Sequence, residues 1–427
     1  MDDSELPSYG EVLAAPQAHG QLEHSYALEI NSHKWLSLFV KSRASSPKSQ
    51  PMFLQGDVIV GRVELHLEKA ETVKGIMIAI EAGTTVVGQE EFKFLDEKQT
   101  LWAPGLDGVK NTPKLKGRYT WPFRLILPSM IPVMGAKGKE KKTYNLPPYF
   151  SERAGPVYID YRLVVTVRRG PLRVNQTLTT IFGYQPVTIP EAPSQLRQLA
   201  YKQGTPILVP GEDPDGWKVL PVVHVKGTLF EVKRVEVKCT LAIALPLTYA
   251  VGSPMPLILT LKSPDTQALD VLSAPNAIRL HLIRSMTTGS DATDEGMTRR
   301  TDNYFLEGVG QAYFWTSSEQ DGNKRVLQGE LEISRNLKPS FVFPRFTIQY
   351  HLELLPFKAP GFVSAIMEGD VALLTEKVTI ATMQTPGITP RSRAPPGYER
   401  PQQVDYNKSV GFLENGNQRF YHHTGHG

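Results

Sequence analysis

Apolar and polar residues alternate strictly along much of this chain, and this alternation constrains the fold more than any other feature. Val63, Leu65 and Leu67 alternate with arginine, glutamate and histidine, and the same period of two recurs over residues 161–168 and 348–354. A period of two sends successive side chains to opposite faces of a β-strand, so these segments are predicted to be half-buried strands packed as sandwiches. The chain is therefore predicted to be all-β.

The strand pattern falls into two blocks, residues 25–190 and 217–382, in which Gly and Pro separate the strands as turns require. A chain of 427 residues is long enough for two sandwich domains that each bury a core. Residues 191–216 are rich in Pro and polar residues and are predicted to be a linker. Residues 1–24 are predicted to be a flexible N-terminal tail, and residues 383–427 a disordered C-terminal tail.

The linker includes one short segment, residues 193–201, with helical spacing. Leu196, Leu199 and Ala200 fall on one side of this predicted helix. No long helical stripe competes with the strand pattern.

Charge and targeting signals exclude some classes of protein. Lys and Arg number 47 against 43 Asp and Glu, a net charge of +4, and so small a surplus argues against a nucleic-acid binder. The first residues are acidic and contain no apolar signal-peptide region. The longest apolar runs fall far short of the roughly 20 residues that cross a membrane. The protein is expected in the cytoplasm.

The chain carries no recognisable catalytic motif. Its one cysteine, Cys239, lies on the apolar face of an alternating segment and is predicted to be a buried core thiol. No nucleophile elbow, phosphate-binding loop or zinc motif is present. His422, His423 and His426 can hold a divalent metal only weakly, because chelation would have to order a Gly-bearing end. We expect no enzyme, no bound metal and no cofactor.

Several segments, in matching order and spacing, resemble the arrestin family. Residues 56–65, GDVIVGRVEL, resemble the opening strands of the arrestin N-terminal domain, and residues 117–128, GRYTWPFRLILP, resemble a later strand. In the second block, residues 245–257, LPLTYAVGSPMPL, and residues 340–350, SFVFPRFTIQY, resemble segments of the arrestin C-terminal domain. The similarity covers about residues 25–382. It is closest to α-arrestins of fungal type, the arrestin-related trafficking adaptors.

This resemblance implies two consecutive arrestin-like, immunoglobulin-like β-sandwich domains. It implies an adaptor that binds the cytosolic tails of membrane transporters or receptors and recruits a HECT-type ubiquitin ligase carrying WW domains. Such an adaptor promotes ubiquitination, endocytosis and sorting of its cargo, and is recruited from the cytoplasm to the plasma membrane or endosomes. The buried charged core that controls visual and β-arrestins is not assigned here, although Arg162 lies in a suggestive strand.

A P-P-x-Y motif formed by Pro395, Pro396 and Tyr398 is the main candidate site. Such a segment favours the polyproline II conformation and docks in the aromatic groove of a WW domain. On the residues alone, a chance match in a Pro-rich tail is an equal alternative. The arrestin resemblance favours the functional interpretation and implies the WW-domain ligase as partner.

Two weaker relatives of this motif are present. Leu6, Pro7 and Tyr9 form an L-P-x-Y variant in the N-terminal tail, either a second WW contact or a chance match. A second WW contact would add avidity if both tails can bind together. Residues 146–149, LPPY, also fit the variant, but they precede a predicted strand and are expected to pack structurally.

Lys137, Lys139, Lys141 and Lys142 form a basic cluster in a Gly-bearing loop. The cluster can attract acidic lipid headgroups or an acidic cargo tail, and its lysines are candidate ubiquitin acceptors. An ordinary solvated loop is the alternative interpretation.

Two further functions stay open. A retromer-type coat or scaffold subunit of the same fold would bind through its sandwiches and have no link to a ligase. An all-β carbohydrate-binding or hydrolytic protein is disfavoured, because no pair of carboxylates stands out near aromatic residues.

Overall fold

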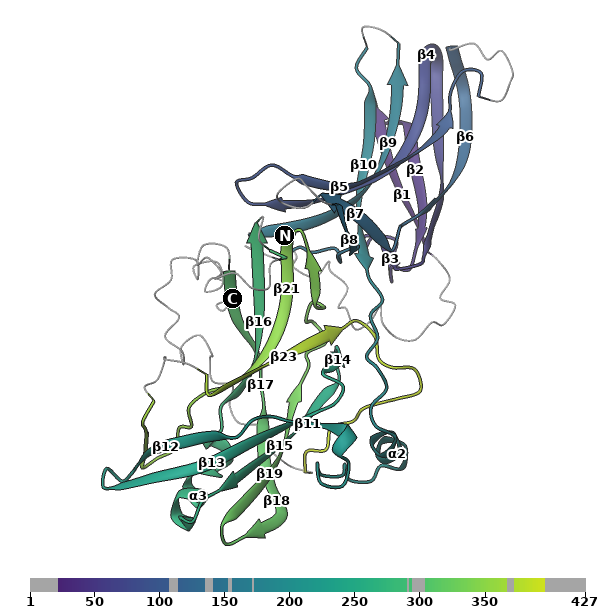
Figure 1. Ribbon diagram of the computed structural model, residues 1–427. Helices are drawn as coiled ribbons and strands as arrows, with labels where there is room; N and C mark the ends of the chain where they lie inside the picture. The colour runs from purple at the N-terminus through teal and green to yellow at the C-terminus, as the bar shows by residue number, and fades with distance from the viewer. Residues whose placement is uncertain are drawn as a thin grey trace. The chain divides into compact units, whose positions relative to one another are not determined.

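The computed structural model describes residues 22–106, 114–134, 141–152, 156–170, 173–289, 292–293, 304–366 and 372–395 of the chain (Figure 1). Strands predominate and form several sheets, so the all-β prediction is confirmed. The chain divides into two compact units. Unit 1 comprises Met1–Val187, Thr288–Glu295 and Val342–Phe346, and unit 2 comprises Thr188–Thr287, Gly296–Phe341 and Thr347–Gly427.

Unit 1 is built on one eight-stranded sheet and a small hairpin. The sheet has the order β1-β2-β4-β9-β10-β3, with β5 and β6 also paired to β4, and β7 pairs with β8. The strands are β1 Leu22–Ile30, β2 His33–Ser42, β3 Met52–Leu54, β4 Val58–Val86, β5 Phe92–Trp102, β6 Lys114–Ile126, β7 Met130–Met134, β8 Lys141–Asn145, β9 Val157–Arg169 and β10 Gln176–Gln185.

Strand β4 is 29 residues long and runs through two sets of partners. Its first part pairs with β2 and β6, where Val63 lies opposite Leu38 and Trp121. Its second part pairs with β5 and β9, where Ile80 lies opposite Leu163. The β4–β6 ladder shifts register between Leu67 and Glu71, and the β4–β9 ladder shifts between Val73 and Gly75. Polar residues interrupt the apolar alternation in this part of β4. One long strand therefore serves both parts of the sheet.

Unit 2 contains most of two sheets, of seven and six strands; the ends of β16, β20 and β21 in the second sheet fall within unit 1. One has the order β18-β19-β15-β13-β12-β22 with β11 paired to β13, and the other has the order β14-β23-β21-β16-β17 with β20 paired to β21. The strands are β11 Trp217–Val219, β12 Val223–Leu229, β13 Lys233–Ala244, β14 Thr248–Ala250, β15 Pro254–Lys262, β16 Leu280–Gly289, β17 Tyr304–Gln311, β18 Tyr313–Asp321, β19 Lys324–Glu332, β20 Phe341–Phe343, β21 Arg345–Leu354, β22 Phe362–Ser364 and β23 Leu374–Ala381. The helical segments are α2 Gln195–Gln203, α3 Thr266–Leu272 and the short 3-10 turns η1 Pro214–Gly216 and η2 Pro275–Ala277.

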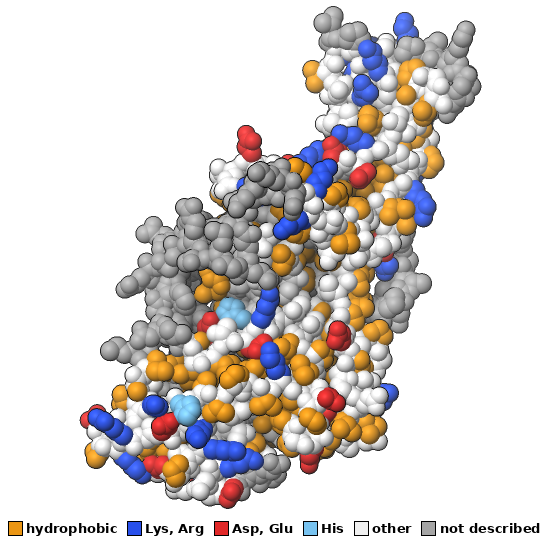
Figure 2. Space-filling view, in the orientation of Figure 1, with side chains coloured by type: hydrophobic (Ala, Val, Ile, Leu, Met, Phe, Trp, Pro, Cys, Tyr) orange, Lys and Arg blue, Asp and Glu red, His pale blue; other side chains and the backbone are white. Residues whose placement is uncertain are grey.

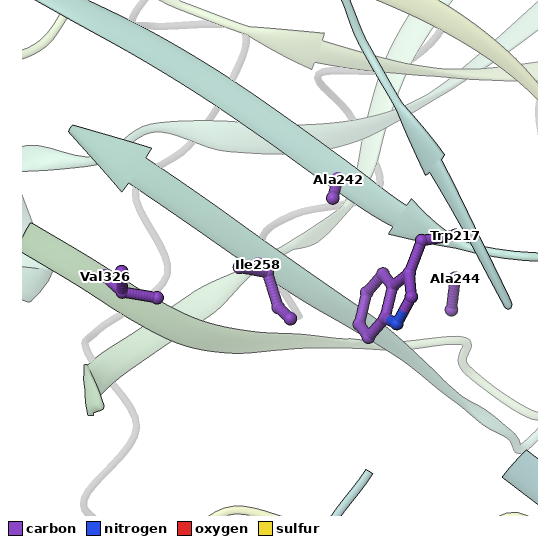
Figure 3. Packing of buried hydrophobic residues seen from close by; sticks show 5 residues of the cluster. All are labelled: Trp217, Ala242, Ala244, Ile258 and Val326. Carbon is purple, nitrogen blue, oxygen red and sulfur yellow. The ribbon is translucent and has the colours of Figure 1, made fainter. Parts of the chain in front are cut away.

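Part of the seven-stranded sheet is buried on both faces. On one face Leu241 and Ile243 of β13 are buried in the core. On the other face Trp217, Ala242, Ala244, Ile258 and Val326 form a second buried cluster (Figure 3). Ile207 and Val209, from the segment predicted to be a linker, pack against this cluster. Burial on both faces explains why residues 241–244 read as a continuous apolar run rather than as an alternating one.

Helix α2 confirms that the predicted linker contains a helix. Ser194 caps its N-terminus, with Oγ accepting a hydrogen bond from the Arg197 backbone N over 3.2 Å. Of the three apolar residues predicted on one side of this helix, Ala200 is buried, whereas Leu196 and Leu199 are 44% and 48% exposed; Arg197 is only 2% exposed. A buried guanidinium, rather than a leucine stripe, holds this helix on unit 2.

Candidate functional site

The chain leaves the last strand of unit 2 and continues as a segment lying on the same unit. We call residues 382–395 the strap. The Thr188 N donates to Thr382 Oγ1 over 2.8 Å, and the Thr382 N donates to Thr188 Oγ1 over 2.9 Å. The Thr385 Oγ1 then donates to the Pro190 carbonyl over 2.9 Å. Thr382, just before the predicted C-terminal tail, and Thr385, inside it, therefore make specific contacts with unit 2.

The strap ends in a group of contacts that we call the clasp: Ser392, Arg393, Glu330 and the carbonyls of Ala200 and Gly204. The Ser392 Oγ donates to Glu330 Oε2 over 3.1 Å, and the Arg393 N donates to the same oxygen over 2.9 Å. The Arg393 Nη2 and Nη1 donate to the Ala200 and Gly204 carbonyls over 3.0 and 3.1 Å.

The clasp suits the chemistry of a helix end. The carbonyls of Ala200 and Gly204 lie at the C-terminus of α2, where backbone acceptors lack helical donors and the helix dipole is negative. An arginine at this end satisfies two acceptors and complements the dipole. Its guanidinium carbon lies 5.9 Å from the ring centroid of Tyr201, which adds a cation–π contact. Burial raises the pKa of Tyr201, so its ring stays neutral at physiological pH.

Two hollows adjoin the strap. A small cavity of about 60 Å³ is lined by strap residues Ile388 and Pro390 together with Tyr201 and Tyr249. Beside the clasp, a groove of about 250 Å³ is lined by Pro206, Trp217, Pro256, Trp315 and Arg393 among others. The lining of the groove therefore includes two tryptophans and two prolines together with Glu330 and Arg393 of the clasp.

The P-P-x-Y motif follows the clasp directly. Pro395, its first proline, is exposed and comes two residues after Arg393. Pro396 and Tyr398 lie outside the described residues, as do Leu6, Pro7 and Tyr9 of the N-terminal variant and the three histidines at the C-terminal end. Their predicted roles stay predictions.

The LPPY segment at residues 146–149 packs structurally, as predicted. Leu146, Pro147 and Pro148 are buried, and the Tyr161 hydroxyl donates to the Pro147 carbonyl over 2.6 Å. The Tyr149 N donates to the Tyr184 carbonyl over 2.8 Å. Burial also raises the pKa of Tyr149. This segment cannot enter a WW groove without unfolding its surroundings.

The structure describes only part of the basic cluster formed by Lys137, Lys139, Lys141 and Lys142. Lys141 and Lys142 are exposed at the start of β8, whereas Lys137 and Lys139 lie outside the described residues. Arg162, which was left without a role, forms an ion pair with Glu91.

A second basic surface, which sequence reasoning missed, lies at the β12–β13 hairpin. Figure 2 shows Lys and Arg side chains at this end of unit 2, with Asp and Glu side chains among them. The basic residues of the hairpin are Lys226, Lys233, Arg234 and Lys238, all exposed, and its acidic residues Glu231 and Glu236 are exposed too. Lys233 forms an ion pair with Asp265 over 2.6 Å. The hairpin tip also exposes two apolar side chains, Phe230 at 55% and Val232 at 87%. The sequence signal for this surface was the pair of apolar residues Phe230 and Val232 in the turn between the two strands, with Lys226 before it and Lys233 after it.

Cys239 is the buried thiol that was predicted. Its side chain is fully buried, and burial raises the pKa of the thiol to about 12, which keeps it protonated and unreactive. Among the residues that the structure describes, no cluster of His, Cys, Asp or Glu has the arrangement of a metal site.

No protein-family model matches the chain, and no curated protein shows a significant match. Within the described part of the chain, no helix is both long and apolar enough to span a bilayer.

Proposed function

We propose that the protein is an adaptor of α-arrestin type, which links a WW-domain HECT-type ubiquitin ligase to membrane cargo. The observation that carries this proposal is the P-P-x-Y motif, whose first proline, Pro395, is exposed at the end of the strap. The ligase would bind Pro395, Pro396 and Tyr398. Two arrestin-like β-sandwiches would bind cytosolic tails of transporters or receptors, and tethering would promote ubiquitination, endocytosis and sorting.

Burial within the described residues supports the choice of motif. The competing LPPY segment is packed in unit 1, so its prolines and Tyr149 are occupied by intramolecular contacts. Pro395, in contrast, presents its ring to solvent. The protein would contribute proximity rather than chemistry, and its work would take place in the cytoplasm and at the plasma membrane or endosomes.

The β12–β13 hairpin supports a peripheral contact with an acidic membrane. Basic side chains attract anionic headgroups, and each contributes on the order of 1 kcal/mol near such a surface. Val232, at 87% exposure, can enter the headgroup region from the hairpin tip. Lys141 and Lys142 on β8 would add to this attraction if both surfaces face the membrane.

A binding experiment with isolated WW domains tests the proposal. The full chain, Tyr398→Ala and Tyr149→Phe would be titrated against WW domains of a HECT-type ligase. We expect a micromolar Kd, about −8 kcal/mol, for the full chain and for Tyr149→Phe, since the Tyr149 hydroxyl lies in the packed segment. Tyr398→Ala should weaken binding at least tenfold. Tyr9→Ala would show whether the N-terminal variant adds avidity.

The retromer-type alternative has a distinct result. Equal binding by the full chain and Tyr398→Ala would overturn the claim for the P-P-x-Y motif. No binding by either would remove the ligase link and favour a scaffold that acts through its sandwiches alone.

A further inference from the structure

The clasp places an exposed serine hydroxyl against a buried carboxylate. The Ser392 Oγ donates to Glu330 Oε2 over 3.1 Å, and the Arg393 N donates to the same oxygen. Glu330 is 2% exposed, whereas Ser392 is exposed. A chemical change at the Ser392 hydroxyl therefore acts directly on the buried Glu330 carboxylate.

The residues around Ser392 are basic. Arg391 precedes it and Arg393 follows it, and Arg391 is exposed. Positive side chains beside a serine complement an acidic substrate groove of a protein kinase. We propose that Ser392 is a phosphorylation site and that its modification opens the clasp. In the transfer, Ser392 Oγ attacks the γ-phosphorus of ATP on a protein kinase, the bond from that phosphorus to the ADP oxygen breaks, and the hydroxyl proton is released.

Phosphorylation changes both sides of the clasp. A phosphoserine carries a charge of about −1.5 to −2 and no longer donates a hydroxyl hydrogen to Glu330. It meets the buried carboxylate as a like charge, in surroundings where charges are poorly screened. Its oxygens also accept hydrogen bonds from a guanidinium, so they compete with the Ala200 and Gly204 carbonyls for Arg393. Both effects favour the open clasp.

The open clasp would free the P-P-x-Y motif, a consequence that rests on the proposed function. Pro395 is two residues from Arg393, at most about 7 Å of extended chain. A domain of about 40 residues, the size of a WW domain, has a radius of gyration of about 9 Å. We therefore expect a WW domain that binds at Pro395 to contact the surface of unit 2 while the clasp is shut. Its apparent affinity falls with the fraction of open molecules.

Hydrogen exchange measures the clasp without any WW domain. The full chain would be made with phosphoserine at position 392 and compared with the unmodified chain. We expect backbone exchange in residues 385–395 to be about tenfold faster in the phosphorylated chain, because opening exposes the Arg393 amide. Unchanged exchange would overturn the proposal.

Two variants separate charge from bulk. Glu330→Gln removes the like charge and offers a side-chain N–H to the phosphate, so phosphorylation in this variant should change exchange by less than about twofold. Ser392→Asn adds bulk, keeps a donor and brings no charge, so its exchange should stay within about twofold of the unmodified chain. The Asn comparison also holds if Glu330→Gln fails to fold. Equal acceleration by phosphoserine and by asparagine would contradict an electrostatic clasp.

A titration with WW domains separates the two proposals. We expect phosphorylation to tighten WW binding about three- to tenfold, and Tyr398→Ala to abolish binding in both forms. If exchange accelerates but no form binds WW domains, the clasp stands and the proposed function fails. If the unmodified chain binds WW domains but exchange does not respond, the proposed function stands and the clasp fails.

Discussion

Thr188 and Thr382 hydrogen-bond to each other's backbone: the Thr188 N donates to Thr382 Oγ1 over 2.8 Å, and the Thr382 N donates to Thr188 Oγ1 over 2.9 Å. The two residues are 194 positions apart and lie where the chain enters unit 2 and where its last strand ends. Thr382 is 1% exposed. The pair closes unit 2 and fixes the point at which the strap begins.

Removing the Thr382 hydroxyl should therefore destabilise unit 2. In Thr382→Val the shape is kept but the Thr188 N loses its acceptor, and we expect a loss of about 1–2 kcal/mol in the free energy of unfolding. Urea denaturation measures it. Thr389→Val, at an exposed strap position, is the matched control and should change the free energy by less than about 0.5 kcal/mol. Equal stability of both variants would contradict the closing role.

The buried Arg197 should be a stronger determinant of stability than the leucines beside it. Its Nη1 donates to the Leu245 carbonyl over 2.9 Å, its Nη2 donates to the Gly216 carbonyl over 2.6 Å, and its guanidinium carbon lies 4.7 Å from the Trp217 ring centroid. Desolvation lowers the pKa of Arg197, but the side chain stays charged at physiological pH.

Arg197→Met would remove the guanidinium donors from the Leu245 and Gly216 carbonyls, of which the Gly216 carbonyl keeps the Leu245 backbone N as a donor, and we expect a loss of about 3 kcal/mol. Leu199→Ala, on an exposed face of the same helix, should cost less than about 1 kcal/mol. Thermal and urea unfolding measure the difference. A larger loss for Leu199→Ala than for Arg197→Met would show that the leucine side chain, and not the guanidinium, holds this helix on unit 2.

His281 should make stability depend on pH in the acidic range. Burial, aided by the charge of Arg279, lowers its pKa to about 4, while the unfolded value is 6.5. Between these values the unfolded chain binds more protons than the folded chain, so stability is retained above about pH 6.5 and lost as the pH falls toward 4.

We expect this contribution to be on the order of 3 kcal/mol at most. His281→Gln should flatten the slope of unfolding free energy between pH 4.5 and pH 6.5 by a corresponding amount. An unchanged slope in His281→Gln would show that other groups carry the acid sensitivity.

Val232 at the β12–β13 tip should contribute to membrane association. Val232→Glu removes the apolar side chain at the tip and adds a second carboxylate beside Glu231, next to Lys233 and Arg234, and we expect at least about fivefold weaker binding to vesicles containing anionic lipid. Val174→Glu is the matched control, because Val174 is also 87% exposed but belongs to unit 1. Sedimentation with vesicles measures both. Equal loss in the two variants would mean that the hairpin tip has no special role.

The strands were predictable because alternation is a local property. Val63, Leu65 and Leu67 are buried at the predicted period, and so are Ile348 and Tyr350. The continuity of β4 was not predictable, because its polar middle at residues 68–72 resembles a turn in the sequence. Short-range spacing shows which face of a strand is apolar but not where one strand passes between two sets of partners.

The candidate site was predictable only in part. Pro395, Pro396 and Tyr398 form a motif with a recognisable local pattern. The clasp does not, because Ser392 meets Glu330 across 62 residues of sequence. The role of Arg197 was not predictable for a similar reason, because its carbonyl partners come from other parts of unit 2.

The adaptor account is tested most directly by affinity capture from cells with membranes retained, comparing the full chain with Tyr398→Ala. The account predicts that the full chain captures both a WW-domain HECT-type ligase and membrane proteins bearing ubiquitin. Tyr398→Ala should keep the membrane proteins but lose the ligase and most of the ubiquitin. Retention of the ligase by Tyr398→Ala, or its absence from both captures, would contradict the account.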